Sequence, residues 1–165
     1  MNGSVSRLGI KPLVPGEVGL PKHAVPLLKV GVNGAEGDYN HYRATELHGD
    51  ADQALLLVTE DLLAQLNAAG WPVQPGDLGE NLTLRGVPEV NLQPGVRLAI
   101  GAIGIEVTRP CGPCKNLYAL PYVGRERGPA FLKATVGRRG WYARVLNEGE
   151  LRTGAGVEIR PPAAG

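Results

Sequence analysis

The sequence predicts a mainly β protein with a few peripheral helices, most simply a β-rich barrel formed by one domain of 165 residues. Two observations carry this prediction. Short segments of alternating apolar and polar residues recur along the chain, as they do in half-buried strands. The 24 glycines and 14 prolines, against one Phe and one Met, are typical of short strands joined by tight turns rather than of a helical bundle.

Charge and hydropathy restrict the possible partners. The 17 basic and 16 acidic residues leave a net charge of +1, so no overall field favours a nucleic acid or a membrane surface, and any anion site must be local. No apolar run approaches the length of a membrane span, and the first residues lack the apolar core of a secretion signal. We therefore expect a soluble, cytoplasmic protein. In that reducing compartment, two neighbouring cysteines bind a metal or take part in catalysis more often than they form a structural disulfide.

The first third of the chain is expected to be strand and loop. We expect an entry strand around Val5, then a loop rich in Pro and Gly, then an edge strand over residues 24–30 that is bent by Pro26. Residues 38–52 are crowded with polar and titratable side chains and lack apolar periodicity, which predicts an exposed or pocket-lining loop. The continuous apolar run over residues 54–58 predicts a buried strand.

The clearest helix signal follows this strand. Thr59 is a typical N-cap, and two acidic residues come next, in the first turn where the helix dipole favours them. The leucines between Leu62 and Leu66 form an inward-facing apolar stripe. Gly70 is expected to end the helix.

Alternating apolar residues predict further strands. Leu82 and Leu84 mark one strand, and residues 96–108 form a hairpin whose second strand leads directly to the two cysteines.

The last third of the chain is expected to contain one helix and one more hairpin. The helix covers residues 128–136. The hairpin begins with the alternating strand 141–145 and turns at residues 147–149, and residues 157–159 pair with the sheet. Residues 161–165 are expected to fray.

Both cysteines lie within residues 108–117, in the order Thr-Arg-Pro-Cys-Gly-Pro-Cys-Lys-Asn-Leu. The spacing of Cys111 and Cys114 matches the dithiol of thioredoxin, where helical amides favour a thiolate as nucleophile or soft-metal ligand. A thioredoxin fold also needs a long helix after the motif. Here Pro121 and Gly124 leave room for about two turns. The sequence therefore predicts a reactive dithiol on a different fold.

The cysteines also have two less reactive interpretations. A structural zinc site needs two further ligands, and the histidines His23, His41 and His48 lack suitable spacing to any other ligand. A plain buried pair is an alternative, because free Cys often behaves as a small core hydrophobe. Against it, Arg109 and Lys115 flank the pair, and cations beside a thiol lower its pKa.

Several basic residues are candidate anion binders, because guanidinium groups and the amides of Gly-rich loops can together hold a phosphate. Most are expected at the solvated surface. Arg138 and Arg139 stand between two glycines, so the backbone there can approach a ligand closely. The lone His48 is a candidate base or ligand contact, although a lone histidine is more often neither. The candidate anion binders are Lys22, Arg43, Arg109, Arg138, Arg139 and Arg144.

Short motifs along the chain occur in an informative order. The signature consists of Thr108, Pro113-Cys114 and Leu117. The motifs before it are Gly19-Leu20-Pro21-Lys22, Gly37-Asp38, His48-Gly49 with Asp52 and Ala54, Gly79-Glu80-Asn81-Leu82, and Pro94-Gly95 with Leu98 and Gly101. With these motifs, residues 16–160 resemble the MOSC domain, named for the C-terminal domain of molybdenum-cofactor sulfurases.

The resemblance implies a MOSC-type β-barrel with a pocket for the pterin-based molybdenum cofactor. In that family the signature cysteine, here Cys114, either ligates molybdenum or carries sulfur as a persulfide, and both uses require a thiolate. The expected cofactor-binding residues are Lys22, His48, Asn81 and Arg109, with Arg138 and Arg139 added as phosphate holders from the chemistry of arginine.

Three positions depart from the family pattern. Cys111 stands where many members have arginine, so an anion contact is missing there or a second thiol serves as a resolving partner. Asp50 replaces a common glycine, and Gln53 stands where a basic residue is common, which weakens phosphate binding at that point. The chain also lacks the additional domains of larger members, which predicts a stand-alone domain.

The first functional hypothesis is a molybdenum-cofactor-dependent oxidoreductase that reduces small N-hydroxylated compounds, with Cys114 as the molybdenum ligand and Cys111 as a second catalytic thiol. Electrons would come from a partner protein, because no dinucleotide or flavin fingerprint is present. A sulfur carrier would instead take sulfur from a donor as a Cys114 persulfide and release it through Cys111. A cofactor-free thiol–disulfide protein and a non-enzymatic binding module are further alternatives. The substrate, the donor and the oligomeric state stay open.

Overall fold

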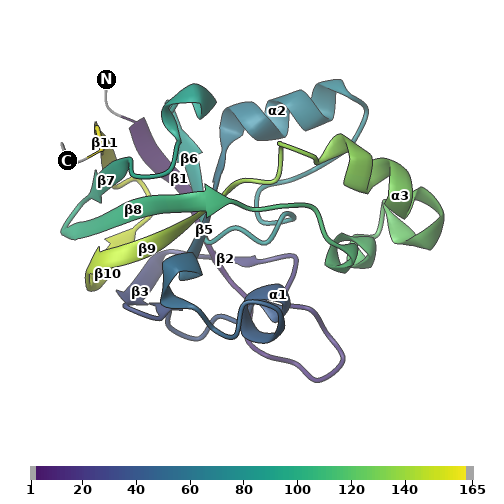
Figure 1. The fold of residues 1–165 in the computed structure, drawn as a ribbon, viewed down its shortest axis with the longest axis horizontal. Coiled ribbons are helices and arrows are strands. Elements are labelled where there is room, and N and C mark those ends of the chain that lie inside the picture. Colours follow the sequence, from purple (N-terminus) through teal and green to yellow (C-terminus); the bar gives the residue numbers. More distant parts are fainter. Residues whose placement is uncertain (1–2, 163–165) are drawn as a thin grey trace.

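The computed structural model describes residues 3–162, and these form a closed β-barrel with helices packed against it (Figure 1). The strands are β1 (Gly3–Ile10), β2 (His23–Val25), β3 (Leu27–Gly31), β4 (Gly34–Ala35), β5 (Leu55–Thr59), β6 (Leu82–Arg85), β7 (Arg97–Ile100), β8 (Ile103–Pro110), β9 (Trp141–Asn147), β10 (Gly149–Arg152) and β11 (Gly156–Arg160). The α-helices are α1 (His41–Thr45), α2 (Glu60–Ala68) and α3 (Gly124–Ala134).

Seven strands close the barrel in the order β11-β7-β8-β9-β5-β6-β1. The barrel closes where Gly3 and Ser4 of β1 pair with β11. The other end of β1 pairs with the short strand β2, which lies at the edge of the sheet. The strands β5 and β6 are parallel, and α2 makes the crossover between them. The predicted mainly β barrel with peripheral helices is therefore confirmed.

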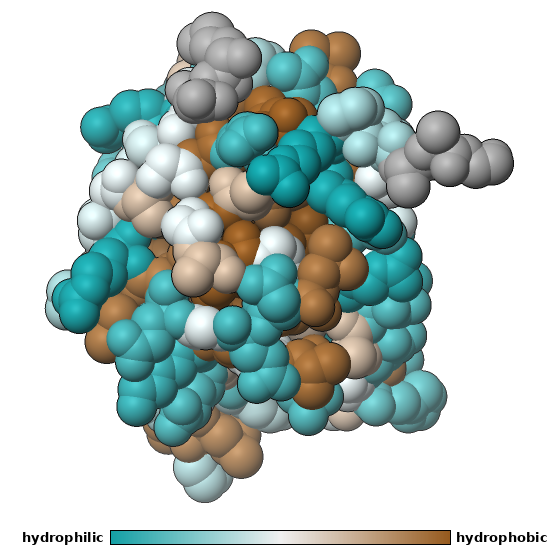
Figure 2. Space-filling model, turned by 90° about the vertical axis from the view of Figure 1, so that its left-hand side faces the viewer, coloured by the Kyte–Doolittle hydropathy of each residue, from teal (hydrophilic) through white to brown (hydrophobic). Residues whose placement is uncertain are grey.

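Two apolar cores hold the molecule together. The barrel core contains alternate residues of the strands, such as Leu57, Leu98 and Ile105, each at most 1% exposed. The second core lies between α2 and α3, where Leu66 packs in the same cluster as Phe131. Each fully buried side chain of this size stabilises the fold by roughly 1.5–3 kcal/mol. Figure 1 shows both helices on one side of the barrel, and Figure 2 shows apolar and hydrophilic residues interspersed over the face opposite α3.

The expected helix after Thr59 is present, and its cap has the expected geometry. The Thr59 hydroxyl accepts a hydrogen bond from the Leu62 backbone N–H at 3.1 Å. The hairpin that leads to the cysteines is also confirmed, since β7 and β8 pair in antiparallel register from Arg97 to Ile100. None of the helices in residues 3–162 is long and apolar enough to cross a membrane.

Several local predictions differ from the structure. The strand expected over residues 24–30 is split at Pro26 into β2 and β3, which belong to different sheets. The polar segment 38–52 contains α1, whose first turn is capped by the Asn40 side chain. The helix expected over residues 128–136 begins earlier, at Gly124, with Pro129 inside it.

The last predicted hairpin was wrong in the pairing of its second strand, although the strand expected over residues 141–145 is present as β9 and residues 157–159 pair with β7 of the sheet, as predicted. The strand β10 does not pair with β9 but with β3, in a separate sheet of three strands ordered β10-β3-β4. Leu151 of β10 lies opposite Leu28 of β3, and both side chains are 1% exposed. Burial of this apolar pair, rather than proximity in sequence, selects the partner strand. Residues 161–162 have no regular structure, and the rest of the segment expected to fray lies outside the described residues.

Candidate functional site

The candidate site lies where β8 ends beside β9. The register of this strand pair runs to Pro110 opposite Trp141, and the next residue, Cys111, donates its backbone N–H to Gly140 O at 2.9 Å. The chain then turns, and Cys114 is the N-cap of a short 3₁₀ helix, Lys115–Ala119. The two cysteines are thus anchored by a barrel strand on one side and a single short helix on the other.

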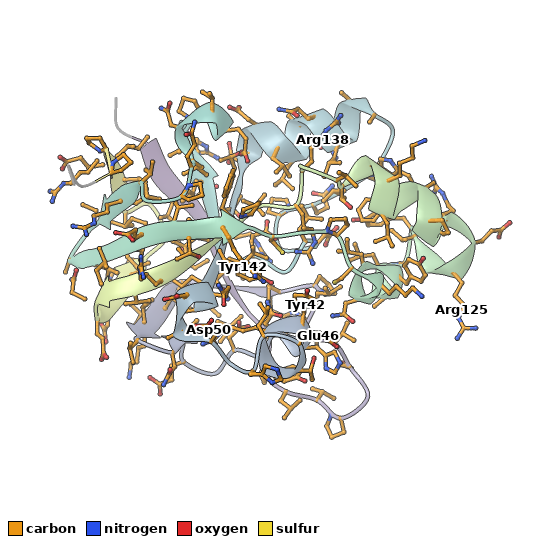
Figure 3. All side chains as sticks on the ribbon, viewed as in Figure 1. Tyr42, Glu46, Asp50, Arg125, Arg138 and Tyr142 are labelled. Carbon is orange, nitrogen blue, oxygen red and sulfur yellow. The ribbon has the colours of Figure 1, made fainter. Side chains whose placement is uncertain are left out.

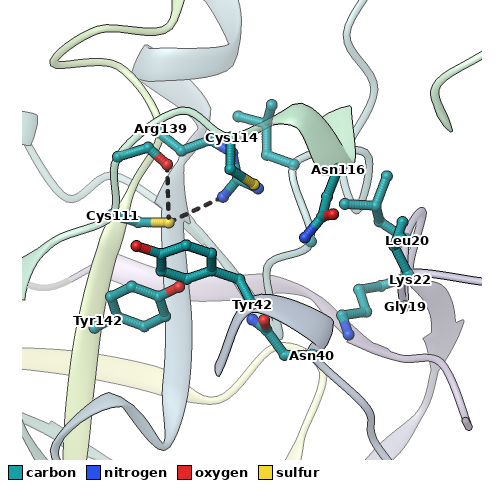
Figure 4. Close-up of a pocket in the computed structure, with 14 residues that line it drawn as sticks. Gly19, Leu20, Lys22, Asn40, Tyr42, Cys111, Cys114, Asn116, Arg139 and Tyr142 are labelled. Atoms are coloured by element: carbon teal, nitrogen blue, oxygen red, sulfur yellow. Dashed lines mark hydrogen bonds between the residues drawn. The ribbon is translucent and has the colours of Figure 1, made fainter. Parts of the chain in front are cut away.

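Cys111 is a buried thiol in contact with a buried guanidinium. It is 6% exposed and packs with Leu56 and Tyr142. Its Sγ accepts a hydrogen bond from Arg139 Nη1 at 3.0 Å (Figure 4).

Arg139 is buried by the path of the chain around it. Its side chain is 5% exposed, and the Nε atom is buried without a hydrogen-bond partner in the described structure. The next residue, Gly140, has φ of +103°, and a Cβ there would lie 2.4 Å from Leu57 O, so the loop can pass this strand only with glycine. Burial lowers the pKa of Arg139, but the nearby Cys111 and Cys114 raise it overall above its usual value. The guanidinium stays charged.

Cys114 lies on the wall of a small pocket and is only partly buried. Figure 4 shows the Arg139 guanidinium beside both cysteines, with Lys22 and Asn40 across the pocket. The free cavity is about 20 Å³, which is room for about one water-sized group. The lining residues are Val18, Gly19, Leu20, Lys22, Asn40, Tyr42, Leu78, Gly79, Cys111, Gly112, Cys114, Asn116, Arg139 and Tyr142.

Two tyrosines contribute phenol groups close to Cys111. In Figure 4 the rings of Tyr42 and Tyr142 lie beside Cys111. Burial, followed by the charge and hydrogen bonding of Cys111, raises the pKa of Tyr142 far above its usual value. The phenol therefore stays protonated and can donate a hydrogen bond. Arg109 lies over the Tyr142 ring, with its Cζ 5.8 Å from the ring centroid.

Lys22 is held by a polar network behind the pocket. Its Nζ donates to Asp38 Oδ1 at 2.8 Å and to Tyr39 O at 2.7 Å, and the residue is 3% exposed. Burial lowers the pKa of Lys22, and the charge of Asp38 opposes this effect. The second Asp38 oxygen accepts from Asn81 Nδ2 at 2.9 Å. The Oδ1 atom of Asn81 also accepts a hydrogen bond from Leu56 N at 3.1 Å. Asn81 therefore supports the hydrogen-bond network around Lys22 and does not line the pocket.

The structure brings together four of the predicted site residues and leaves four outside the pocket wall. Cys111, Cys114, Lys22 and Arg139 line the same pocket. The residues outside its wall are His48, Asn81, Arg109 and Arg138. His48 is exposed and has a left-handed backbone with φ of +51°, Asn81 belongs to the Lys22 network, and both arginines are exposed.

The neighbouring arginines of the Gly-Arg-Arg-Gly motif have opposite environments. Arg138 is exposed, and Figure 3 shows it on the α2 side of the molecule, away from Tyr42 and Tyr142, whereas Arg139 is buried against Cys111. The site residues that the sequence did not single out are Asn40, Tyr42, Asn116 and Tyr142. Asn40 had a detectable signal, because an Asn before a helical segment is a typical N-cap; the two tyrosines had none.

No group of three or more His, Cys, Asp or Glu side chains in residues 3–162 is arranged to hold a metal ion. The pocket offers two thiols, so a metal bound here would have to bring most of its ligands with it. Larger hollows exist elsewhere, such as one of about 690 Å³ over β3, β4 and β10, but the cysteines and the two buried cations are all at the smaller pocket.

Comparisons with known proteins identify the family and the fold of the chain. The family model for the MOSC domain matches residues 44–158. No curated protein matches the chain. Among solved structures, the YuaD protein from Bacillus subtilis has a TM-score of 0.80 at 19% identity, covering 99% of this chain and 98% of that one.

Two structures of YiiM show the same fold. YiiM from Geobacillus stearothermophilus has a TM-score of 0.70 at 24% identity, with 96% of this chain and 75% of that one covered. YiiM from Escherichia coli has a TM-score of 0.65 at 23% identity, with 100% and 72% covered. Because the family model matches more than half of its residues, the chain belongs to the MOSC domain family, which is associated with binding of the molybdenum cofactor.

Proposed function

We propose that this protein binds the molybdenum cofactor at the pocket between β8 and the Lys115–Ala119 helix, and that it reduces small N-hydroxylated compounds. The observation that carries the proposal is the position of Cys114, a partly accessible thiol on the wall of a pocket that also contains the buried cation Arg139. When bound, the cofactor supplies a two-electron molybdenum centre that accepts oxygen from the substrate.

The chemistry of the residues fits this group. A thiolate is a suitable donor for a soft-accepting metal, and the two pocket thiols leave room for a metal that carries its own sulfur ligands. The cofactor is anionic, and the unpartnered Nε of Arg139 together with the Lys22 ammonium provides positive charge in the pocket. The cavity of about 20 Å³ cannot enclose a pterin, so the pocket would have to widen on binding.

The chain's own residues would have separate roles in the reaction. Cys114 would hold the metal, while Arg139 would hold the adjacent Cys111 sulfur in place through the hydrogen bond from its Nη1 atom. Tyr142, protonated because of its burial, can donate a hydrogen bond at the pocket. The protons needed for loss of a hydroxyl group as water would come from solvent. Electrons would come from a partner protein.

Sulfur carriage is the second candidate function, and the proximity of Cys111 and Cys114 in one pocket favours it. Here a persulfide on Cys114 would transfer its outer sulfur when the Cys111 thiolate attacks the Cys114 sulfur, leaving a disulfide and releasing hydrosulfide. The two thiols supply both electrons for this step.

One experiment separates these functions. The protein is purified from a host that makes the cofactor, and molybdenum and pterin are measured in the wild type and in the matched variants Cys114→Ser and Cys111→Ser. We expect about one molybdenum and one pterin per chain in the wild type, from a single site, retention in Cys111→Ser, and loss in Cys114→Ser. Absence of both from the wild type would contradict cofactor binding. Pterin retained in Cys114→Ser would contradict the ligand assignment and favour sulfur carriage.

A further inference from the structure

The two cysteines form a pair of thiols that can act on one ligand. Cys111 and Cys114 are both free, and both line the same small pocket (Figure 4). The backbone of Cys111 is anchored to Gly140 O, and Cys114 begins the Lys115–Ala119 helix. Gly112 between them is exposed, and a Cβ added there would meet no heavy atom within 4 Å. The loop therefore has free space in which the positions of the two sulfurs can adjust.

The ligands that this pocket offers are soft. Its wall contains the two thiols but no carboxylate and no imidazole among the described residues. Structural zinc requires two further ligands, and calcium and magnesium prefer oxygen ligands, so each of these ions would have to bring most of its ligands. Copper(I), a soft monovalent ion, prefers thiolates, and two of them in a linear arrangement complete its coordination.

The charge of the pocket also favours a monovalent ion. Metal binding removes the proton of each ligating thiol, so two thiolates and one copper(I) ion form a complex with one net negative charge. Arg139 supplies the matching positive charge, because it is 5% exposed and its Nη1 lies 3.0 Å from the Cys111 sulfur. The charge of Lys22 is already balanced by Asp38, at 2.8 Å. A divalent ion would leave excess positive charge in a buried site, where charge is costly.

Arg139 also has donors that are free to contact such a complex. Its Nε is buried without a hydrogen-bond partner in residues 3–162, and Figure 4 shows its guanidinium beside both cysteines. Metal-bound sulfurs still accept hydrogen bonds, and such bonds orient and tune metal ligands. The free space of about 20 Å³ has room for about one water-sized group, and a bare ion without further ligands is no larger than that.

We propose that Cys111 and Cys114 together bind one copper(I) ion as a bis-thiolate, and that Arg139 neutralises the complex. Binding is a ligand exchange without electron transfer: two S–H bonds break, two copper–sulfur bonds form, and the protons leave to solvent. Cys111 stands where many members of the family have arginine. The site therefore depends on a residue at which this chain departs from the family pattern.

This inference goes beyond the proposed function. Cys114 can serve one metal at a time, so copper(I) and the molybdenum cofactor are alternatives at this thiol. The experiment uses protein from a host that does not make the cofactor, so its result is independent of cofactor binding. Absence of copper binding alongside normal cofactor loading would overturn this inference and leave the proposed function intact.

The experiment is an anaerobic titration of the reduced, cofactor-free protein into the coloured copper(I) complex of bicinchoninate, in which loss of colour measures transfer of copper to the protein. We expect about one copper(I) ion per chain, because the two thiols form a single site. X-ray absorption of the product should show two sulfur neighbours and no nitrogen or oxygen neighbour. Cys111→Ser and Cys114→Ser should each weaken binding about a hundredfold or more, because a single thiol loses the advantage of two linked ligands.

The two neighbouring arginines provide a matched pair of variants. Arg139→Gln should weaken copper binding about tenfold or more, because the negative complex then lacks its buried counter-ion. Arg138→Gln should leave the affinity unchanged, because Arg138 is exposed and outside the pocket. An excess of zinc should not displace the copper, and displacement would contradict a two-ligand site.

Full affinity in Cys111→Ser would overturn the proposal. So would one copper ion per two chains, because it would indicate that Cys114 thiols of separate molecules bridge the ion. Equal affinity in Arg139→Gln and the wild type would contradict neutralisation by Arg139. If Arg139→Gln does not fold, the serine variants and the absorption spectrum decide: two sulfur neighbours support the bis-thiolate, and a nitrogen or oxygen neighbour contradicts it.

Discussion

The amide nitrogen of Asn81 lies 2.9 Å from a carboxylate oxygen of Asp38, and the other oxygen of Asp38 lies 2.8 Å from Lys22 Nζ. A residue in the strand-entry motif Gly-Glu-Asn is thereby connected to the cation on the pocket wall. Asn81 also bonds the backbone of Leu56 and of Gly9. Asn81 therefore helps to hold Lys22 in position through Asp38, although Asn81 itself does not line the pocket.

Replacement of Asn81 should therefore destabilise the fold. In Asn81→Ala, the Leu56 N–H and the Gly9 carbonyl lose their buried partner, and we expect the free energy of unfolding to fall by about 2–5 kcal/mol. Chemical denaturation measures this change. Asn91→Ala, at an exposed position, is the control and should stay within about 0.5 kcal/mol. A loss as small as the control's would show that the network contributes nothing to stability.

Glu80 should make the stability depend on pH. It is fully buried, one of its oxygens has no partner in the described structure, and Thr83 Oγ1 donates to the other at 3.2 Å. Burial raises its pKa above the ordinary value of 4.5. Because the native pKa is the higher one, the native state retains the proton to higher pH than the unfolded state. Its stabilising contribution is complete below pH 4.5 and is lost as the pH rises through the native pKa.

The measurement is urea denaturation of Glu80→Gln and the wild type at several pH values from about 4.5 upward. We expect the wild type to lose stability relative to the variant as the pH rises, because glutamine has no proton to lose. Glu150→Gln, at an exposed position, should follow the wild type. Parallel curves for Glu80→Gln and the wild type would mean that Glu80 is not protonated in the native state.

Gly140 should be the most sensitive glycine of the Gly-Arg-Arg-Gly motif. Its φ is +103°, and a Cβ would lie 2.4 Å from Leu57 O, so Gly140→Ala combines backbone strain with a clash against a central strand. We expect a loss of about 2–4 kcal/mol.

The matched control is Gly137→Ala, at the other end of the motif. Gly137 has φ of +70° with open space around it, so the cost should be about 1–2 kcal/mol from strain alone. Thermal or chemical unfolding compares the two variants. Equal losses of unfolding free energy in the two variants would show that the close approach to Leu57 of β5 adds nothing to the cost of a side chain at residue 140.

Some of the fold followed from local sequence alone. The Thr59 cap, the acidic first turn and the leucine stripe predicted α2, because these signals act within one or two helical turns. The alternation over residues 96–108 predicted the β7–β8 hairpin and with it the position of the cysteines at the end of a strand. Hairpin partners are close in sequence, so their pairing needs little long-range information.

The sequence by itself therefore determined the class of fold, the helix α2 and the position of Cys111 and Cys114 directly after a barrel strand. Tertiary structure alone decided the rest. The pairing of β10 with β3 depends on burial of leucines more than a hundred residues apart, and the contact between Arg139 and Cys111 joins residues 28 positions apart. Neighbouring side chains such as Arg138 and Arg139 have identical local chemistry, and the path of the chain past β5 decides which one is buried. Local propensity cannot specify such choices, because the free energy that selects them comes from packing and charge between distant segments.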